Sequence, residues 1–68
     1  MIIKTFSELC EAANDIDFKD ETAAYRFKML VDTYNEALVE AKDHGWIGVG
    51  CITYAEQELV RIQNEMKE

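Results

Sequence analysis

The chain has 68 residues, of which 49% are hydrophobic, and its 14 acidic and 7 basic side chains give a formal net charge of −7. This length allows one small domain, residues 1–68, and the acidic balance argues against direct binding to nucleic acid or to anionic membranes, which requires a basic surface. A domain of this size has too little interior for so many apolar side chains, so the composition predicts a homo-oligomer, a dimer or larger.

The first predicted helix covers about residues 6–15. Thr5 and Glu8 have the T-x-x-E spacing of a capping box, in which the threonine hydroxyl accepts a hydrogen bond from the backbone N–H three residues later. Apolar residues then recur at helical spacing, at Phe6, Leu9, Cys10 and Ala13. The sequence therefore predicts a short N-terminal helix, preceded by four residues that form a short strand or only pack against the core.

The strongest pattern lies in residues 20–44, which contain no helix-breaking residue. Asp17 or Asp20 is placed to cap the start of a helix, and Gly45 stands where a left-handed residue commonly ends one. The segment predicts a long helix with one buried face, whose apolar residues are Ala23, Ala24, Phe27, Leu30, Val31, Tyr34, Ala37, Leu38 and Ala41.

A third helix is predicted over about residues 53–66. Thr53 and Glu56 repeat the T-x-x-E spacing, and the apolar residues behind them are Ile52, Ala55, Leu59, Ile62 and Met66. The connection to the long helix is short, so the two helices should run antiparallel. The predicted fold class is all-α, with the short N-terminal helix packed on this helical hairpin and a glycine-rich crossover between its two arms.

The crossover, residues 44–56 with the sequence HGWIGVGCITYAE, contains all three glycines and the single tryptophan. In the favoured interpretation Trp46 fills the core, the chain crosses closely over itself, and residues 47–51 form a very short strand. In a second interpretation the third helix begins early, near Ile47, at the cost of having glycines in its interior.

A ligand site is the third interpretation of the crossover. Backbone N–H groups at a helix N-terminus, together with Trp46, Gly48, Gly50 and Thr53, could hold a phosphorylated or aromatic ligand, such as a nucleotide, in a homo-oligomer. The standard dinucleotide and Walker folds are excluded, because a helix rather than a buried strand precedes the glycines and no lysine follows them.

Four carboxylates spaced by four, four and three residues form a ridge on the long helix, at Asp32, Glu36, Glu40 and Asp43. Like charges at this spacing weaken an isolated helix, so the ridge is either a solvated face or a binding surface for a basic protein. Tyr25 lies on the polar side of the same helix and is the kind of residue that interfaces favour.

The function we favour from the sequence is a non-enzymatic acidic protein-binding module, a small regulator or inhibitor that docks on a basic surface of a partner. Compact acidic domains of this kind are frequent among accessory proteins of phages and mobile elements. The alternative is a homo-oligomeric protein that binds or sequesters a small ligand near Trp46, and a purely structural oligomerisation domain is the third hypothesis.

Enzymatic and metal-dependent functions find little support. His44 is the only histidine and has no serine nearby, and no cofactor or metal motif is present. Cys10 and Cys51 are interpreted as buried, reduced thiols, with a disulfide between them as the alternative. The absence of a signal peptide or of a long apolar run predicts a cytoplasmic protein.

Overall fold

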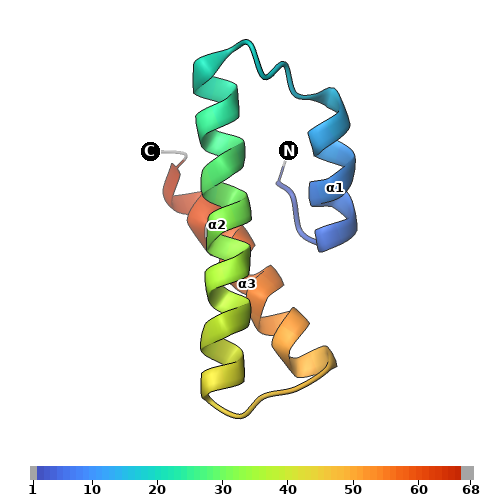
Figure 1. The fold of residues 1–68 in the computed structure, drawn as a ribbon, viewed down its shortest axis with the longest axis vertical. Coiled ribbons are helices and arrows are strands. Elements are labelled where there is room, and N and C mark those ends of the chain that lie inside the picture. The colour runs from blue at the N-terminus through green and yellow to red at the C-terminus, as the bar shows by residue number, and fades with distance from the viewer. Residues whose placement is uncertain (1, 67–68) are drawn as a thin grey trace.

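The computed structural model describes residues 2–66, which form three helices and no strand (Figure 1). The helices are α1 (Phe6–Asp15), α2 (Glu21–Asp43) and α3 (Val49–Met66). The all-α prediction is confirmed, and α1 has the bounds expected from its pattern. Within the described residues, none of the three helices combines the length and apolar character needed to cross a membrane.

Both ends of α2 are closed by the residues that the sequence singled out. The carboxylate of Asp20 accepts hydrogen bonds from two backbone N–H groups of the first turn, at 3.1 and 3.4 Å. At the other end Gly45 adopts a left-handed conformation with φ of 84°. The N–H of Gly45 then bonds to the carbonyl of Lys42, and the N–H of Trp46 to that of Ala41, both at 2.9 Å. These two bonds form a Schellman motif, which ends the helix and reverses the chain.

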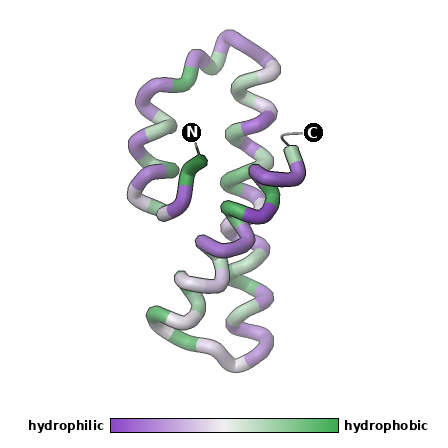
Figure 2. Tube along the Cα trace, turned by 180° about the vertical axis from the view of Figure 1, so that it is seen from behind, coloured by the Kyte–Doolittle hydropathy of each residue, from purple (hydrophilic) through white to green (hydrophobic). Residues whose placement is uncertain are grey.

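The core lies where α3 returns along α2 and crosses it obliquely (Figures 1 and 2). Ala41, Ala55 and Leu59 are fully buried. Alanines at the crossing allow the two helices to approach closely, and Leu59 fills the space that remains. The buried cluster consists of Leu9, Leu30, Tyr34, Ala37, Ala55 and Leu59. The predicted buried face of the long helix is therefore confirmed at its centre.

α1 is attached to this hairpin by few apolar contacts. Leu9 is its one buried side chain. Phe6 is half exposed, yet its ring stacks on Tyr34 of α2 with 5.1 Å between ring centroids. Cys10 is exposed, so the prediction of a buried thiol at that position is wrong. The wrong prediction arose because one apolar face on so short a helix offers room for only one deeply buried residue.

Polar side chains of α3 supply the rest of the attachment. The amide of Gln63 accepts a hydrogen bond from the N–H of Ile3 at 2.9 Å and donates one to the Ile3 carbonyl at 2.6 Å. The carboxylate of Glu56 accepts a hydrogen bond from the N–H of Phe6 at 3.1 Å, at the start of α1. The side chain of Gln63 thus pairs with both backbone groups of Ile3, as the backbone of a neighbouring strand would do in a sheet.

The predicted start of the third helix is wrong by four residues. α3 begins at Val49, as in the early-start interpretation, so Gly50 and Thr53 lie inside the helix and residues 47–51 form no strand. Gly48, with φ of 64°, makes the sharp entry that allows this early start. Thr53 therefore has no free helix end to cap. The carboxylate of Glu56 instead accepts the hydrogen bond from the N–H of Phe6, at the start of α1.

Candidate functional site

The four predicted carboxylates lie together on the exposed side of α2, and two apolar side chains accompany them. Tyr25 and Val39 are 64% and 60% exposed. Each is seven residues, or about two turns, from Asp32, so the three lie on one line along the helix. We call this surface the acidic face; its members are Tyr25, Asp32, Glu36, Val39, Glu40 and Asp43.

Two carboxylates of the acidic face already have partners within the chain. Asp32 pairs with Lys28 one turn earlier, at 2.9 Å, and this hydrogen bond raises the pKa of the lysine. Glu40 accepts a hydrogen bond from the hydroxyl of Tyr54 at 3.4 Å. Glu36 and Asp43 are exposed on the same face. All four carboxylates therefore face solvent, and Glu36 and Asp43 are the two that can be replaced without removing either of these contacts.

Trp46 lies at the surface, which contradicts the prediction that it fills the core. Its ring lies between two aromatic neighbours, edge-on to Tyr54 at 5.2 Å and tilted against His44 at 6.0 Å between centroids. The Schellman turn sends the chain outward at this position, and the early start of α3 leaves no path for the indole into the core. Trp46 thus joins the end of α2 to the second turn of α3 from the outside.

A shallow hollow opens beside this indole. Its volume is about 390 Å³, and its lining consists of Trp46, Gly50, Thr53, Tyr54 and Gln57. The structure therefore brings three of the four predicted ligand residues together, while Gly48 lies outside the hollow. Partial burial, followed by the charges of nearby glutamates, raises the pKa of the Tyr54 phenol, so the phenol is neutral and can donate a hydrogen bond.

Gly50 leaves part of this hollow empty. A Cβ atom built on Gly50 would meet no atom from elsewhere in the chain within 4 Å. Glycine inside a helix costs up to about 1 kcal/mol relative to alanine. No packing within the described residues compensates for this cost, and the open space beside the Gly50 backbone faces solvent.

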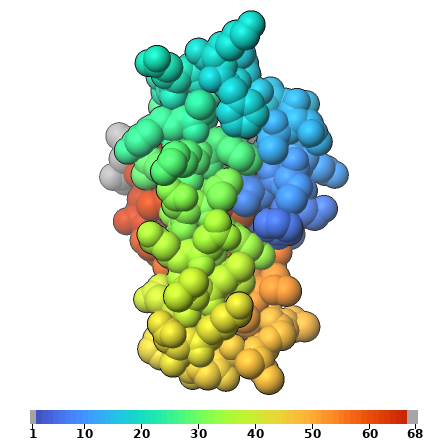
Figure 3. All heavy atoms as spheres, in the orientation of Figure 1, coloured from blue at the N-terminus to red at the C-terminus, as the bar shows by residue number. Residues whose placement is uncertain are grey.

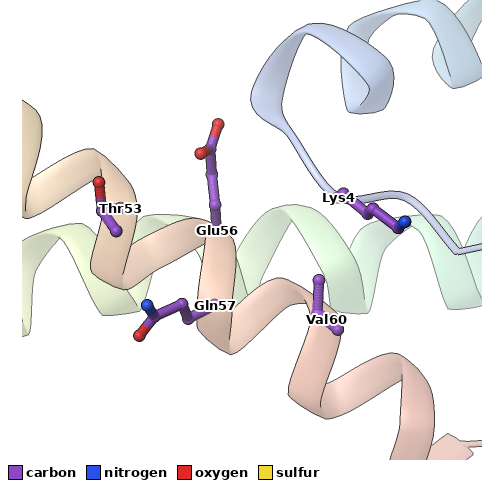
Figure 4. Close-up of a pocket in the computed structure, with 5 residues that line it drawn as sticks. All are labelled: Lys4, Thr53, Glu56, Gln57 and Val60. Carbon is purple, nitrogen blue, oxygen red and sulfur yellow. The ribbon is translucent and has the colours of Figure 1, made fainter.

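A second hollow, of about 360 Å³, lies between the N-terminal segment and α3. Figure 4 shows Lys4 on the segment opposite Thr53, Glu56, Gln57 and Val60 of α3. Because Glu56 already accepts the hydrogen bond from the first N–H of α1, this hollow offers little that is free to bind a ligand.

Residues 2–66 contain no cluster of side chains with metal-binding geometry. No group of three histidine, cysteine or carboxylate side chains comes together there as metal ligands. Both cysteines are free thiols; the buried one, Cys51, lies with its sulfur 3.5 Å from the carbonyl oxygen of Leu38 on α2. Its position is that of a small core residue.

Comparison with known proteins gives no relative. No family model matches the sequence, and no curated protein or solved structure is significantly similar to it. The candidate sites therefore depend on their own geometry. Sequence reasoning missed Val39, although its seven-residue spacing from Asp32 could have revealed it, and also Tyr54 and Gln57, whose part in the hollow depends on the early start of α3.

Proposed function

We propose that this protein is a non-enzymatic protein-binding module that docks the acidic face of α2 on a basic surface of a partner protein. The observation that carries the proposal is the pairing of solvent-facing carboxylates with two exposed apolar side chains on one helix face. Carboxylates steer a basic partner into place, and a tyrosine beside them supplies the desolvated contact that gives an interface its affinity.

The alternative, a merely solvated face, explains the carboxylates but not Tyr25 and Val39. Each exposes more than half of its surface without contributing to the core. In an interface of ordinary size a partly exposed tyrosine of this kind is a typical anchor. A regulator or inhibitor acting in the cytoplasm, such as an accessory protein of a phage or mobile element, is the setting that we propose.

The test is native mass spectrometry of complexes captured from the protein's own host. The double variant Glu36→Lys with Asp43→Lys replaces two of the four exposed carboxylates of the acidic face by lysines and leaves the Tyr54–Glu40 contact in place. A matched control, Glu11→Lys with Asp15→Lys, makes the same change of net charge on exposed positions of α1.

We expect the wild type and the α1 variant to retain the same basic partner, and the acidic-face variant to lose it. Tyr25→Ala should weaken the complex tenfold or more, about 1.4 kcal/mol. If the wild type and both double variants all retain the partner, the assignment of the acidic face as the binding surface is contradicted. If no partner is captured, the proposed protein-binding function itself is contradicted.

The hollow beside Trp46 favours a second candidate function, the binding of a small aromatic or phosphorylated ligand. Its volume of about 390 Å³ falls within the range of small-molecule sites, and its lining combines an indole and a neutral phenol with polar side chains. Trp46 is the single tryptophan, so its fluorescence reports directly on the hollow. Quenching by a mononucleotide in a metabolite panel, lost in Thr53→Ile, supports this function, and unchanged emission throughout the panel opposes it.

A further inference from the structure

The connection between α2 and α3 presents an exposed apolar surface. Trp46, Ile47, Val49 and Ile52 are 46%, 85%, 79% and 45% exposed. Half of the exposed large hydrophobic side chains in the described part of the chain fall within these seven residues. We call residues 46–52 the hairpin tip. It lies at the lower end of the molecule in Figure 1, where the hydropathy colouring of Figure 2 and the surface view of Figure 3 also show it.

The hairpin tip is also the uncharged part of an acidic molecule. Residues 45–55 form the longest stretch of the sequence without a charged side chain, in a chain whose net charge is −7. A basic partner has no reason to choose this surface, because the carboxylates lie elsewhere. A second copy of the same chain is better suited to this surface, because two copies that meet at residues 45–55 bring no carboxylates of this stretch together.

The area is consistent with a small symmetric dimer. The four side chains expose together on the order of 500 Å², taking roughly 150–250 Å² for one fully exposed large side chain. Two such surfaces and their flanking residues reach roughly the 1,200 Å² at which specific interfaces begin. An isolated domain of this length buries too little surface to be robustly stable, so self-association also supplies core that the single chain lacks.

The hairpin tip carries a projecting side chain, and a recess lies between the tip and the following turns of α3. Ile47 is the most exposed side chain of the tip. The recess is the hollow beside Trp46, which the missing side chain of Gly50 leaves open. In a dimer with a two-fold axis, Ile47 of each copy meets the recess of the other copy. The same contact between Ile47 and the recess is therefore made twice.

We propose that the hairpin tip is a self-association surface on which a second copy of this chain packs about a two-fold axis, with Ile47 of each copy entering the hollow beside Trp46 and Gly50 of the other. The recess adjoins the acidic face only where Tyr54 bonds to Glu40, and Tyr25, Asp32 and Glu36 lie further along α2, so a dimer leaves most of the acidic face of both copies free.

Sedimentation equilibrium over a range of concentrations tests the dimer. We expect the wild type to pass from one chain to two in the micromolar range, and Ile47→Asp to weaken association at least a hundredfold. Phe18→Asp is the control, because it gives the same charge to another exposed apolar residue, 60% exposed against 85% for Ile47, just before the start of α2 and far from the hairpin tip. A wild type that stays a single chain up to millimolar concentration overturns the proposal, as does equal weakening by the two variants.

Gly50→Ala separates association from folding. The added methyl group meets nothing within the chain and raises helix propensity, so the monomer should become more stable. The same methyl group narrows the recess, so the dimer should weaken by tenfold or more. A dimer of unchanged affinity in this variant contradicts the contact between Ile47 and the recess.

Salt and the single tryptophan distinguish this proposal from partner binding by the acidic face. Screening reduces the repulsion between two acidic copies, so added salt should strengthen the dimer, whereas it should weaken docking on a basic protein. The emission of Trp46 should shift to the blue as the dimer forms. Glu36→Lys with Asp43→Lys should keep the dimer while losing the partner, and Ile47→Asp should do the opposite. A dimer that weakens with salt, or a Trp46 emission that does not change with concentration, overturns the proposal.

Discussion

α3 and α1 both dock on α2, but they do so by different means. α3 packs through a continuous apolar stripe in which Ala55 and Leu59 are fully buried. α1 contributes one buried leucine. Its position is fixed mainly by hydrogen bonds between the N-terminal backbone and two side chains of α3: Glu56 accepts from the N–H of Phe6, and Gln63 both accepts from and donates to Ile3. Apolar packing is strong but non-directional, whereas hydrogen bonds to backbone groups are weaker and specify one position.

This difference predicts a hierarchy of stability. Opening of the α2–α3 hairpin should require the full free energy of global unfolding. Local opening of α1 should require less free energy, and the hairpin should remain folded when it occurs. The variants below test that hierarchy, from the largest expected effect to the smallest.

Leu59→Ala should have the largest effect. Leu59 is completely buried between the two long helices, and removal of its side chain should lower the free energy of unfolding by about 3–5 kcal/mol. Leu9→Ala on α1 should cost only about 2–3 kcal/mol, since the lightly held helix can move to close part of the cavity. Urea denaturation followed by circular dichroism measures both. A loss at Leu9 equal to that at Leu59 would show that α1 belongs to the same cooperative unit.

Gln63→Ala should release the N-terminal segment. It removes both hydrogen bonds to Ile3, and we expect a loss of about 1–2 kcal/mol because the freed backbone groups are only partly buried. Hydrogen exchange should quicken in α1 and stay slow in the hairpin. Gln57→Ala removes an exposed glutamine from the same helix and should change neither quantity. Uniformly faster exchange in all three helices would contradict a separate role for Gln63.

The two T-x-x-E motifs should respond differently to the same substitution. The hydroxyl of Thr5 accepts the N–H of Glu8 at 3.1 Å, so Thr5→Ala should destabilise the protein by about 1 kcal/mol. Thr53 is exposed in the interior of α3, and Thr53→Ala should be neutral or stabilising by a few tenths of a kcal/mol, because alanine is the better helix former. Equal losses would show that Thr53 caps a helix that starts later than Val49.

The smallest effect concerns pH. Burial, together with the charge of Glu56, raises the pKa of Tyr34, and partial burial with the charges of Glu40 and Glu58 raises that of Tyr54. Each raised pKa favours the neutral phenol in the folded protein, so its contribution is complete below about pH 10 and is lost as pH rises through the folded value. Ultraviolet titration should show these phenols ionising at higher pH in the folded chain than in denaturant. Coincident titration curves would contradict the raised values.

The sequence predicts the packing of α3 on α2 well because that packing follows from periodicity. The long helix keeps its expected buried face, with Tyr34 and Ala37 near its centre, and its two ends are marked by Asp20 and Gly45. Each of these signals acts through neighbours within one or two turns. Local physics is enough to place such residues correctly.

The start of α3 could not be predicted in the same way. Thr53 and Glu56 have a correct local pattern, but Gly48 turns the chain early and Glu56 finds a partner in α1, 50 residues away. The role of Gln63 was missed for the same reason, since no local pattern distinguishes a glutamine that holds a distant backbone from one that faces solvent. A T-x-x-E motif predicts a helix start only where no earlier turn has already started the helix.

The two candidate surfaces also differ in whether local sequence patterns are enough to predict them. The acidic face follows from helical spacing and could be found from sequence. The hairpin tip could not, because its exposed apolar residues were assigned to a strand or to the core. Trp46 illustrates the difficulty: an indole beside glycines has the same composition whether it fills an interior or lies on the outside of a turn. Only the direction of the Schellman turn decides between these outcomes, and that direction depends on where α3 begins.

The bond pair between Ile3 and Gln63 spans 60 residues of chain, and this has a consequence for the order of events during synthesis. Ile3 is made before the three helices, but the side chain of Gln63 that holds it is made 60 residues later. α2 and α3 follow each other directly, so they can pair as soon as both have emerged, and the loop that joins Ile3 to Gln63 must close afterwards. Of the three helices, α1 is therefore made before the others and should be fixed in place last, and until then the apolar side chains of residues 2–9 should be open to chaperones or to a neighbouring nascent chain.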